Sequence, residues 1–157
     1  MCAKFSHRQV ILMDDELERI KQEKLRRLLQ PELQTSKYPV GQVVELTDSN
    51  FEDFVKQQGI VVVDCWAVWC APCRSMAPVM DQLAKEWGNK GVHIGKLNVD
   101  HNPRTAMRYG ISSIPNFLVF QNGKFLGNIV GAVGKAPFVK LFKKLLKEND
   151  DEKEGHV

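Results

Sequence analysis

The chain contains little cysteine and no long hydrophobic run. Its four cysteines among 157 residues are too few for the dense disulfide framework of small secreted proteins. No apolar stretch approaches the roughly 18 residues that a transmembrane helix requires, and the first residues lack the apolar segment of a signal peptide. We therefore expect a cytoplasmic protein that does not enter a membrane.

The chain also has only a small excess of positive over negative charge. The net charge is only +3, and part of the basic surplus lies on the last expected helix, at Lys140, Lys143, Lys144 and Lys147. A nucleic-acid site would combine a basic cluster with aromatic or groove-reading elements, and no such combination is visible. We expect these lysines to form a solvated helix face and the protein to have no nucleic-acid partner.

Residues 1–42 read as an extension ahead of the main domain. Residues 14–30 have a helical pattern, in which Leu17, Ile20 and other apolar residues gather on one broad side. Pro31 ends this pattern, because proline cannot continue a helix. Residues 31–42 have the composition of a linker.

The extension raises two expectations. Met13 precedes an acidic cluster and would make a credible translation start, so residues 1–12 are expected to be a mobile tail or an upstream extension. A helix as short as residues 14–30 is marginal alone in water. Its apolar side is therefore expected to dock, either on its own domain or on a partner.

Residues 43–147 have the pattern of one α/β domain. The expected strands are 43–46, 60–66, 92–98, 117–121 and 124–130. The expected helices are 47–57, 71–88, 103–109 and a last helix after Gly134. Thr47, Asp48 and Ser49 supply capping side chains for the helix 47–57. Helices between strands imply parallel crossovers, and the Asn122-Gly123 turn adds an antiparallel pair. We expect a single mixed sheet of about five strands flanked by helices on both faces, followed by a disordered polar tail, residues 148–157.

The strongest functional signal is the sequence Trp69-Cys70-Ala71-Pro72-Cys73. An apolar run at residues 60–63 predicts a buried strand before it, and an apolar stripe at helical spacing predicts a helix after it. The cysteines therefore lie where a strand passes into a helix. The N-terminus of a helix has unpaired N–H groups and a partial positive charge, which favour the reactive thiolate over the thiol.

Two chemistries compete for this Cys-x-x-Cys pair. In disulfide exchange, Cys70 would attack a substrate disulfide and Cys73, almost one turn later, would resolve the mixed disulfide. Pro72 would stiffen the loop and Trp69 could shield one side of it. A structural zinc site needs four ligands, and within the domain only the isolated His93 and His101 remain. We favour redox chemistry and expect no metal.

An acid interrupts the apolar strand that leads to the cysteines. Burial of Asp64 in that strand would be costly or would raise its pKa, which suits a proton acceptor for Cys73; alternatively the carboxyl reaches water at the strand end. Lys96, on the next expected strand, either pairs with Asp64 or faces solvent. Cys65 is expected to be a small core residue.

The motif and its surroundings resemble the thioredoxin family. The residues that carry the resemblance are the run 63–73, the segment 95–100, Ile114-Pro115, Asn122-Gly123 and Gly131, and the likeness extends from residue 43 to residue 147. The resemblance implies the thioredoxin fold and a cytosolic dithiol reductase that carries no bound cofactor. It also implies that a thioredoxin reductase recharges the protein and that its substrates are disulfide-containing proteins.

The resemblance also assigns roles to residues. Cys70 is implied to be the nucleophile, Cys73 the resolving thiol, Asp64 the buried acid, Lys96 its neighbour and Pro115 the family's cis-proline. The implied substrate-binding positions, where an extended segment would add to the backbone, are Trp69, Ala71, Pro72, Ile114, Pro115, Gly131 and Ala132.

Two positions depart from the commonest pattern of the family. Ala71 replaces a glycine between the cysteines, and Asn116 replaces a threonine after the proline. Such neighbours tune thiolate stability, so the preferred direction of exchange stays open. We expect general protein disulfide reduction. The alternatives are an isomerase or oxidase, or a binding module on the same fold that docks through the N-terminal helix.

Overall fold

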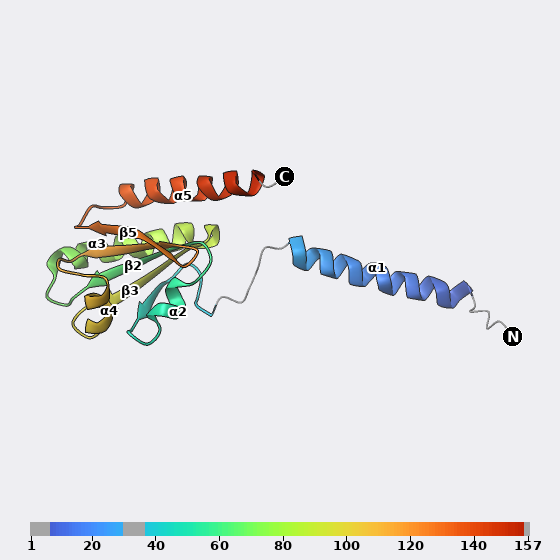
Figure 1. Ribbon diagram of the computed structural model, residues 1–157, viewed down its shortest axis with the longest axis horizontal. Helices are drawn as coiled ribbons and strands as arrows, with labels where there is room; N and C mark the ends of the chain where they lie inside the picture. The colour runs from blue at the N-terminus through green and yellow to red at the C-terminus, as the bar shows by residue number, and fades with distance from the viewer. Residues whose placement is uncertain (1–6, 30–36, 156–157) are drawn as a thin grey trace. The chain divides into compact units, whose positions relative to one another are not determined.

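The computed structural model describes the backbone of residues 7–29 and 37–155, and the side chains of residues 14–26 and 37–155. The chain divides into two compact units, Met1–Lys37 and Tyr38–Val157. In the first unit, helix α1 spans His7–Leu29 (Figure 1). The helix predicted from residue 14 thus begins seven residues earlier, so residues 7–12 of the expected mobile tail or upstream extension are helical. Residues 1–6 of that segment lie outside the described residues. Residues 31–36 of the predicted linker lie outside the described residues.

The second unit contains a single five-stranded sheet. Its elements are β1 (Val43–Leu46), α2 (Phe51–Val55), β2 (Ile60–Trp66), α3 (Ala71–Trp87), a short 3-10 turn (Gly88–Lys90), β3 (Val92–Asn98), α4 (Pro103–Arg108), β4 (Asn116–Gln121), β5 (Lys124–Val130) and α5 (Ala136–Glu154). The strand order is β1-β3-β2-β4-β5. β1, β3 and β2 run parallel, and β4 and β5 are antiparallel to their neighbours. The predicted mixed α/β sheet is confirmed.

Helices cover both faces of this sheet (Figure 1). Successive side chains of a strand point to opposite faces, so the central strand β2 divides its residues between two cores. Ile60 and Val62 pack with residues of α3 and α5, whereas Val61, Val63 and Cys65 pack with residues of α2. β2 is buried along nearly its whole length, as a strand covered on both sides must be.

The N-terminus of α2 differs from the prediction. Its N-cap is Asn50, which makes no capping side-chain hydrogen bond. Asp48, one of the expected caps, instead accepts hydrogen bonds from the backbone N–H and the hydroxyl of Thr105 on α4, at 2.9 and 2.6 Å. The hydroxyl bond in particular holds the pKa of Asp48 below its usual value. Asp48 therefore ties the β1–α2 loop to α4, a long-range contact that local spacing does not reveal.

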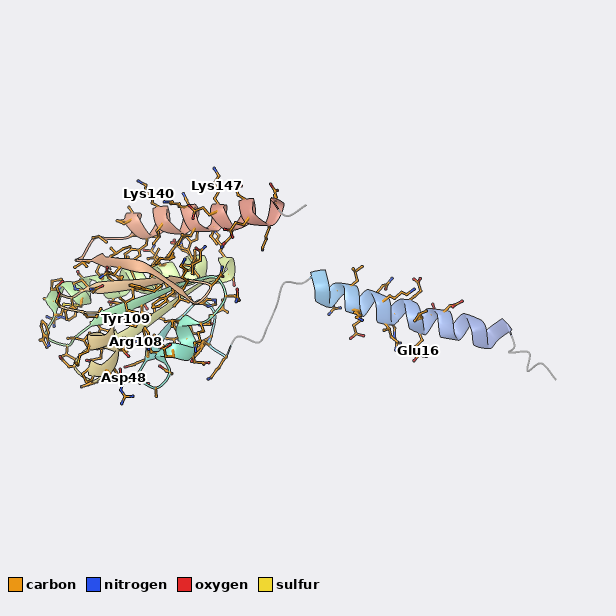
Figure 2. The ribbon with its side chains drawn as sticks, in the orientation of Figure 1. Glu16, Asp48, Arg108, Tyr109, Lys140 and Lys147 are labelled. Atoms are coloured by element: carbon orange, nitrogen blue, oxygen red, sulfur yellow. A yellow bond between two sulfur atoms is a disulfide. The ribbon has the colours of Figure 1, made fainter. Side chains whose placement is uncertain are left out.

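Helix α5 continues beyond the boundary expected from composition. Residues 148–154 were predicted to lie in a disordered tail, but they form the last turns of α5. The Gln121 side chain donates hydrogen bonds to the Leu145 carbonyl and to Asn149 Oδ1, at 3.4 and 3.1 Å, and these bonds anchor the helix across the predicted boundary. Lys140 and Lys147 lie on the outer side of α5 and are exposed (Figure 2), which confirms the expected solvated face.

No helix among the described residues is both long enough and apolar enough to cross a lipid bilayer.

Candidate functional site

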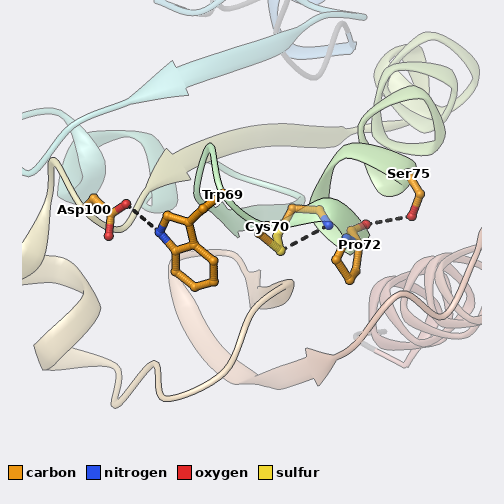
Figure 3. The surroundings of a disulfide bond; sticks show 6 residues. Trp69, Cys70, Pro72, Ser75 and Asp100 are labelled. Atoms are coloured by element: carbon orange, nitrogen blue, oxygen red, sulfur yellow. Dashed lines mark hydrogen bonds between the residues drawn. A yellow bond between two sulfur atoms is a disulfide. The ribbon is translucent and has the colours of Figure 1, made fainter.

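The two cysteines of the motif form a disulfide at the start of α3 (Figure 3). Their Cα atoms are 5.3 Å apart. Cys70 is the N-cap residue of the helix, and its sulfur accepts a hydrogen bond from the backbone N–H of Cys73 at 3.2 Å. Both residues are buried, with 4% and 3% of their surface exposed. The strand-to-helix turn predicted from the sequence therefore places Cys70 where a thiolate gains most from the helix dipole.

The first turn of α3 is held by its own residues. Pro72 occupies an early helical position, where its missing N–H has no intrahelical partner to lose and its fixed φ suits the helix. The Ser75 hydroxyl donates to the Pro72 carbonyl at 2.7 Å (Figure 3). Ala71 and Pro72 are both exposed. The loop between the sulfurs is thus short, anchored and open to solvent on its outer side.

Trp69 stands beside the disulfide as an exposed side chain, with 68% of its surface accessible. Its indole N–H donates to Asp100 Oδ2 at 2.9 Å (Figure 3). Asp100 was not among the predicted site residues. The parallel strands β2 and β3 both end next to the cysteine turn. The position of Asp100, two residues after β3, could therefore have indicated that it lies near Trp69.

Asp64 is buried in the middle of the sheet, with 5% of its surface exposed. It lies in register with Lys96 on β3 and Phe117 on β4. Its Oδ1 atom has no hydrogen-bond partner within the described part of the chain. Burial raises the pKa of Asp64 to about 7, although the positive charge of Lys96 opposes the shift. The alternative that this carboxyl simply reaches water at a strand end is wrong.

Because successive side chains of β2 point to opposite faces of the sheet, Asp64 lies on the face that α3 covers. Ile60 and Val62, which precede it at even spacing, pack against Met76 and Met80 of that helix. Cys73 lies on the same helix, one turn before Met76. The acid and the second cysteine therefore belong to the same layer of the protein, between β2 and the first turns of α3.

Lys96 is half-buried, so it does not simply face solvent. Among the described residues it makes no hydrogen bond to Asp64 Oδ1. Its Nζ atom lies 5.6 Å from the centre of the Trp66 ring, within the range of a cation–π interaction. The ammonium is thus held near the end of β2, where it acts on Asp64 through charge alone.

Cys65 points to the other face of the sheet. It is fully buried in the core beneath α2, as predicted for a small core residue. Burial raises the pKa of its thiol to about 12, and the negative charge of Asp64 adds to the shift. A thiol in that state has almost no thiolate at neutral pH and is inert to exchange.

A cis peptide bond joins Ile114 to Pro115, ahead of β4. Ile114 packs against the small cluster formed by Ala67, Cys70 and Cys73. The Pro115 carbonyl accepts a hydrogen bond from the backbone N–H of Gly131 at 2.8 Å, and Gly131 takes a positive φ of 99°. The fold thus brings the Ile114-Pro115 segment to the disulfide and the Gly131 segment to Pro115. Ala132 is exposed just beyond Gly131.

Asn116, the unusual residue after Pro115, is buried at the start of β4. Its Oδ1 atom accepts a hydrogen bond from the Asn128 side chain on β5 at 3.1 Å. This bond gives a buried amide a partner, as burial of a polar group requires. Sequence reasoning noted the departure at Asn116 but not its partner.

The histidines that could complete a zinc site do not join the cysteines. His93 pairs in register with Val61, close to the start of β2, whereas the cysteines follow its other end. His101 is exposed in the loop after β3. Among the residues described by the structure, no group of three or more His, Cys, Asp or Glu side chains could hold a metal ion.

Comparison with known proteins gives a consistent result. The thioredoxin family model matches residues 42–144. The thioredoxin of Buchnera aphidicola is 44% identical over 111 residues, which cover 70% of this chain and 98% of that protein. The thioredoxin of Staphylococcus saprophyticus is 41% identical over 104 residues, covering 66% and 98%.

A plant relative shows the same likeness. The chloroplastic M-type thioredoxin of Pisum sativum is 43% identical over 108 residues, which cover 68% of this chain and 62% of that protein. The family match, residues 42–144, contains the five strands and the cysteine turn and leaves out the N-terminal extension. The chain belongs to the thioredoxin family and is a protein-disulfide reductase whose redox-active group is a cysteine pair, with no bound cofactor.

Proposed function

We propose that Cys70 is the nucleophile and Cys73 the resolving thiol of this reductase. The reduced Cys70 thiolate attacks one sulfur of a substrate disulfide, forms a mixed disulfide and releases the other substrate sulfur as a thiolate. The Cys73 thiolate then attacks Cys70 Sγ and releases the second substrate sulfur. Two electrons pass to the substrate, and the Cys70–Cys73 disulfide is left. The observation that carries this assignment is the position of Cys70 as the N-cap of α3.

We propose that Asp64 accepts the proton of Cys73 before the resolving attack. A carboxyl with a pKa near 7 can take a proton and return it at neutral pH, which is the condition for efficient general base catalysis. Its free Oδ1 atom offers the acceptor, by way of a water molecule where the direct path is too long. Lys96 serves as a positioning charge that keeps this pKa from rising further.

The proposed substrate surface surrounds the disulfide. Trp69, Ala71 and Pro72 contribute exposed side chains beside Cys70. Ile114 and Pro115 bring a stretch of backbone to the cysteines, and Gly131 and Ala132 extend it. An extended substrate segment could pair with this backbone as an added strand, which places its disulfide against Cys70.

Membership of the family implies thioredoxin reductase as the electron donor and disulfide-containing proteins as substrates. We propose the cytoplasm as the compartment, because a dithiol reductase works where cellular reductants keep thiols reduced.

We also propose that α1 is a docking element, since its described side chains, residues 14–26, are all exposed.

The test is reduction of insulin disulfides, combined with the reduction potential of the cysteine pair. We expect multiple turnovers with thioredoxin reductase as donor and a reduction potential of about −270 mV, the value typical of thioredoxins. A reduction potential of about −180 mV or higher, in the range of disulfide isomerases and oxidases, would instead favour the isomerase or oxidase. Failure of the wild-type protein to reduce insulin would overturn the proposal.

A further inference from the structure

Helix α1 presents an apolar stripe that the disulfide chemistry does not use. Leu17 is 51% exposed and Ile20 56%. In the sequence, Val10, Met13, Leu17, Ile20 and Lys24 follow one another at alternating spacings of three and four residues. That spacing is the heptad pattern of a coiled-coil seam, with Leu17 at an a position and Ile20 at the following d position.

We propose that α1 pairs with α1 of a second copy of this chain in a parallel two-stranded coiled coil. The inference gives the proposed docking element a specific partner. It rests on the docking role of α1 and not on the roles assigned to Cys70 and Cys73.

The charges beside the stripe complement each other between identical helices. With Leu17 at position a, Glu16 occupies position g and Lys21 occupies position e. In a parallel dimer, residue g of one helix faces residue e of the next heptad on the other. Glu16 of each copy therefore faces Lys21 of the other, and symmetry gives two attractive pairs. Both side chains are exposed (Glu16 is labelled in Figure 2) and free to meet a partner helix.

The antiparallel arrangement is less favourable. If Leu17 of one copy packs opposite Ile20 of the other, Glu16 of one copy lies opposite Glu23 of the other. Like charges on facing side chains repel. The attraction between Asp14 and Lys21 in that arrangement only offsets the repulsion. The flanking e and g pairs thus favour the parallel orientation, in which Lys24 of one copy faces Lys24 of the other at the a position.

Lys24 occupies the next a position of the seam, and Arg27 follows at the next d position. Charged residues at core positions help to specify the oligomeric state at a cost in stability. The alkyl stem of Lys24 can cover the seam while its ammonium reaches Glu23 of the other copy. The short seam and this lysine together predict a reversible dimer that forms as the protein concentration rises.

The test is the mass of the full-length protein in solution, measured by analytical ultracentrifugation under reducing conditions over a wide concentration range. We expect the mass to approach twice the monomer value of 17.9 kDa at high concentration. Leu17→Asp is expected to raise the dimer dissociation constant at least about tenfold, because it places a carboxylate in the apolar seam. The matched control is Gln22→Asp, which adds the same charge on the opposite side of α1 and should leave dimerisation unchanged.

Charge reversal tests the orientation without removing an apolar residue. Glu16→Lys is expected to weaken the dimer about fivefold, since two attractive pairs become repulsive, and Glu16→Lys combined with Lys21→Glu should restore it. A dimer strengthened by Glu16→Lys would overturn the parallel orientation. A wild-type protein that stays monomeric at every concentration, with α1 docked on its own domain or reserved for another protein, would overturn the inference.

The reductase assay separates this inference from the proposed function. Leu17→Asp should reduce insulin at the wild-type rate, because Leu17 lies outside the cysteine site. Loss of the dimer with full activity supports the inference. Loss of activity in wild type and variant alike would count against the proposed function and leave the dimer measurement valid.

Discussion

Asp64 and Lys96 lie directly opposite each other on the parallel strands β2 and β3. Burial and charge act on the carboxyl in opposite directions: removal of water raises its pKa, and the ammonium lowers it. Burial dominates, and the pKa reaches about 7. The acid behind the cysteine turn can therefore change its protonation state at the pH where the protein works.

Asp64→Asn should abolish one component of the pH dependence of stability. Between its unfolded pKa near 4 and its folded pKa of about 7, the folded wild-type protein holds a proton that the unfolded chain has released. Its free energy of unfolding should therefore fall as the pH rises through this window, by at most about 4 kcal/mol. Guanidinium denaturation of the oxidised proteins at pH 4 to 8 measures the difference; parallel curves for the two proteins would contradict the assignment.

Lys96→Met should raise the pKa of Asp64 above that of the wild type. The substitution keeps a similar apolar stem but removes the positive charge that opposes the shift. Titration of the Asp64 carboxyl carbon by NMR in the oxidised protein measures the change. Lys90→Met is the matched control, since Lys90 lies over Trp87 and is not a cause of the Asp64 shift. An unchanged or lowered pKa in Lys96→Met would show that the ammonium does not act on Asp64.

Cys65 should resist thiol reagents in the native protein. Its thiol is fully buried and its pKa is raised to about 12, so the thiolate is neither formed nor accessible. Mass spectrometry after brief iodoacetamide treatment of the reduced protein at pH 8 should find label on Cys70 and none on Cys65. Labelling of Cys65 should appear only after unfolding; rapid native labelling would contradict its placement in the core.

Asp100→Ala should loosen Trp69 without unfolding the domain. The substitution removes the side-chain oxygen that accepts the indole N–H, and an exposed hydrogen bond of this kind contributes about 1 kcal/mol or less to stability. Exchange of the Trp69 indole proton with solvent, followed by NMR, should accelerate while the midpoint of unfolding changes little. The buried Trp87 supplies an internal control; equal acceleration at both indoles would indicate general loosening instead.

The core of the site is predictable because it is local in sequence. The apolar β-branched run of β2, the Cys-x-x-Cys spacing and the apolar stripe of α3 lie within one continuous stretch, and each follows from hydrophobic periodicity. The burial of Asp64 follows as well, since a strand covered on both faces leaves a mid-strand carboxyl without water.

The features that sequence reasoning missed depend on contacts between distant segments. Asp48 caps α4 through Thr105, Asn128 bonds to Asn116, and Asp100 holds Trp69. None of these partners shares a short motif, so only the fold brings them together. The predicted end of α5 was wrong for a related reason. Composition suggested disorder after residue 147, whereas Gln121 on strand β4 donates a hydrogen bond to Asn149 and so anchors the last turns of the helix.

The central claim is that Cys70 attacks the substrate and Cys73 resolves the mixed disulfide. The most direct test is to mix reduced Cys73→Ser protein with a disulfide substrate and identify the covalent product by peptide mass spectrometry. We predict a stable mixed disulfide on Cys70, released on addition of a reductant, and loss of multiple turnover; Cys70→Ser should trap far less substrate on Cys73. Full turnover by Cys73→Ser, or preferential trapping on Cys73 in Cys70→Ser, would contradict the account.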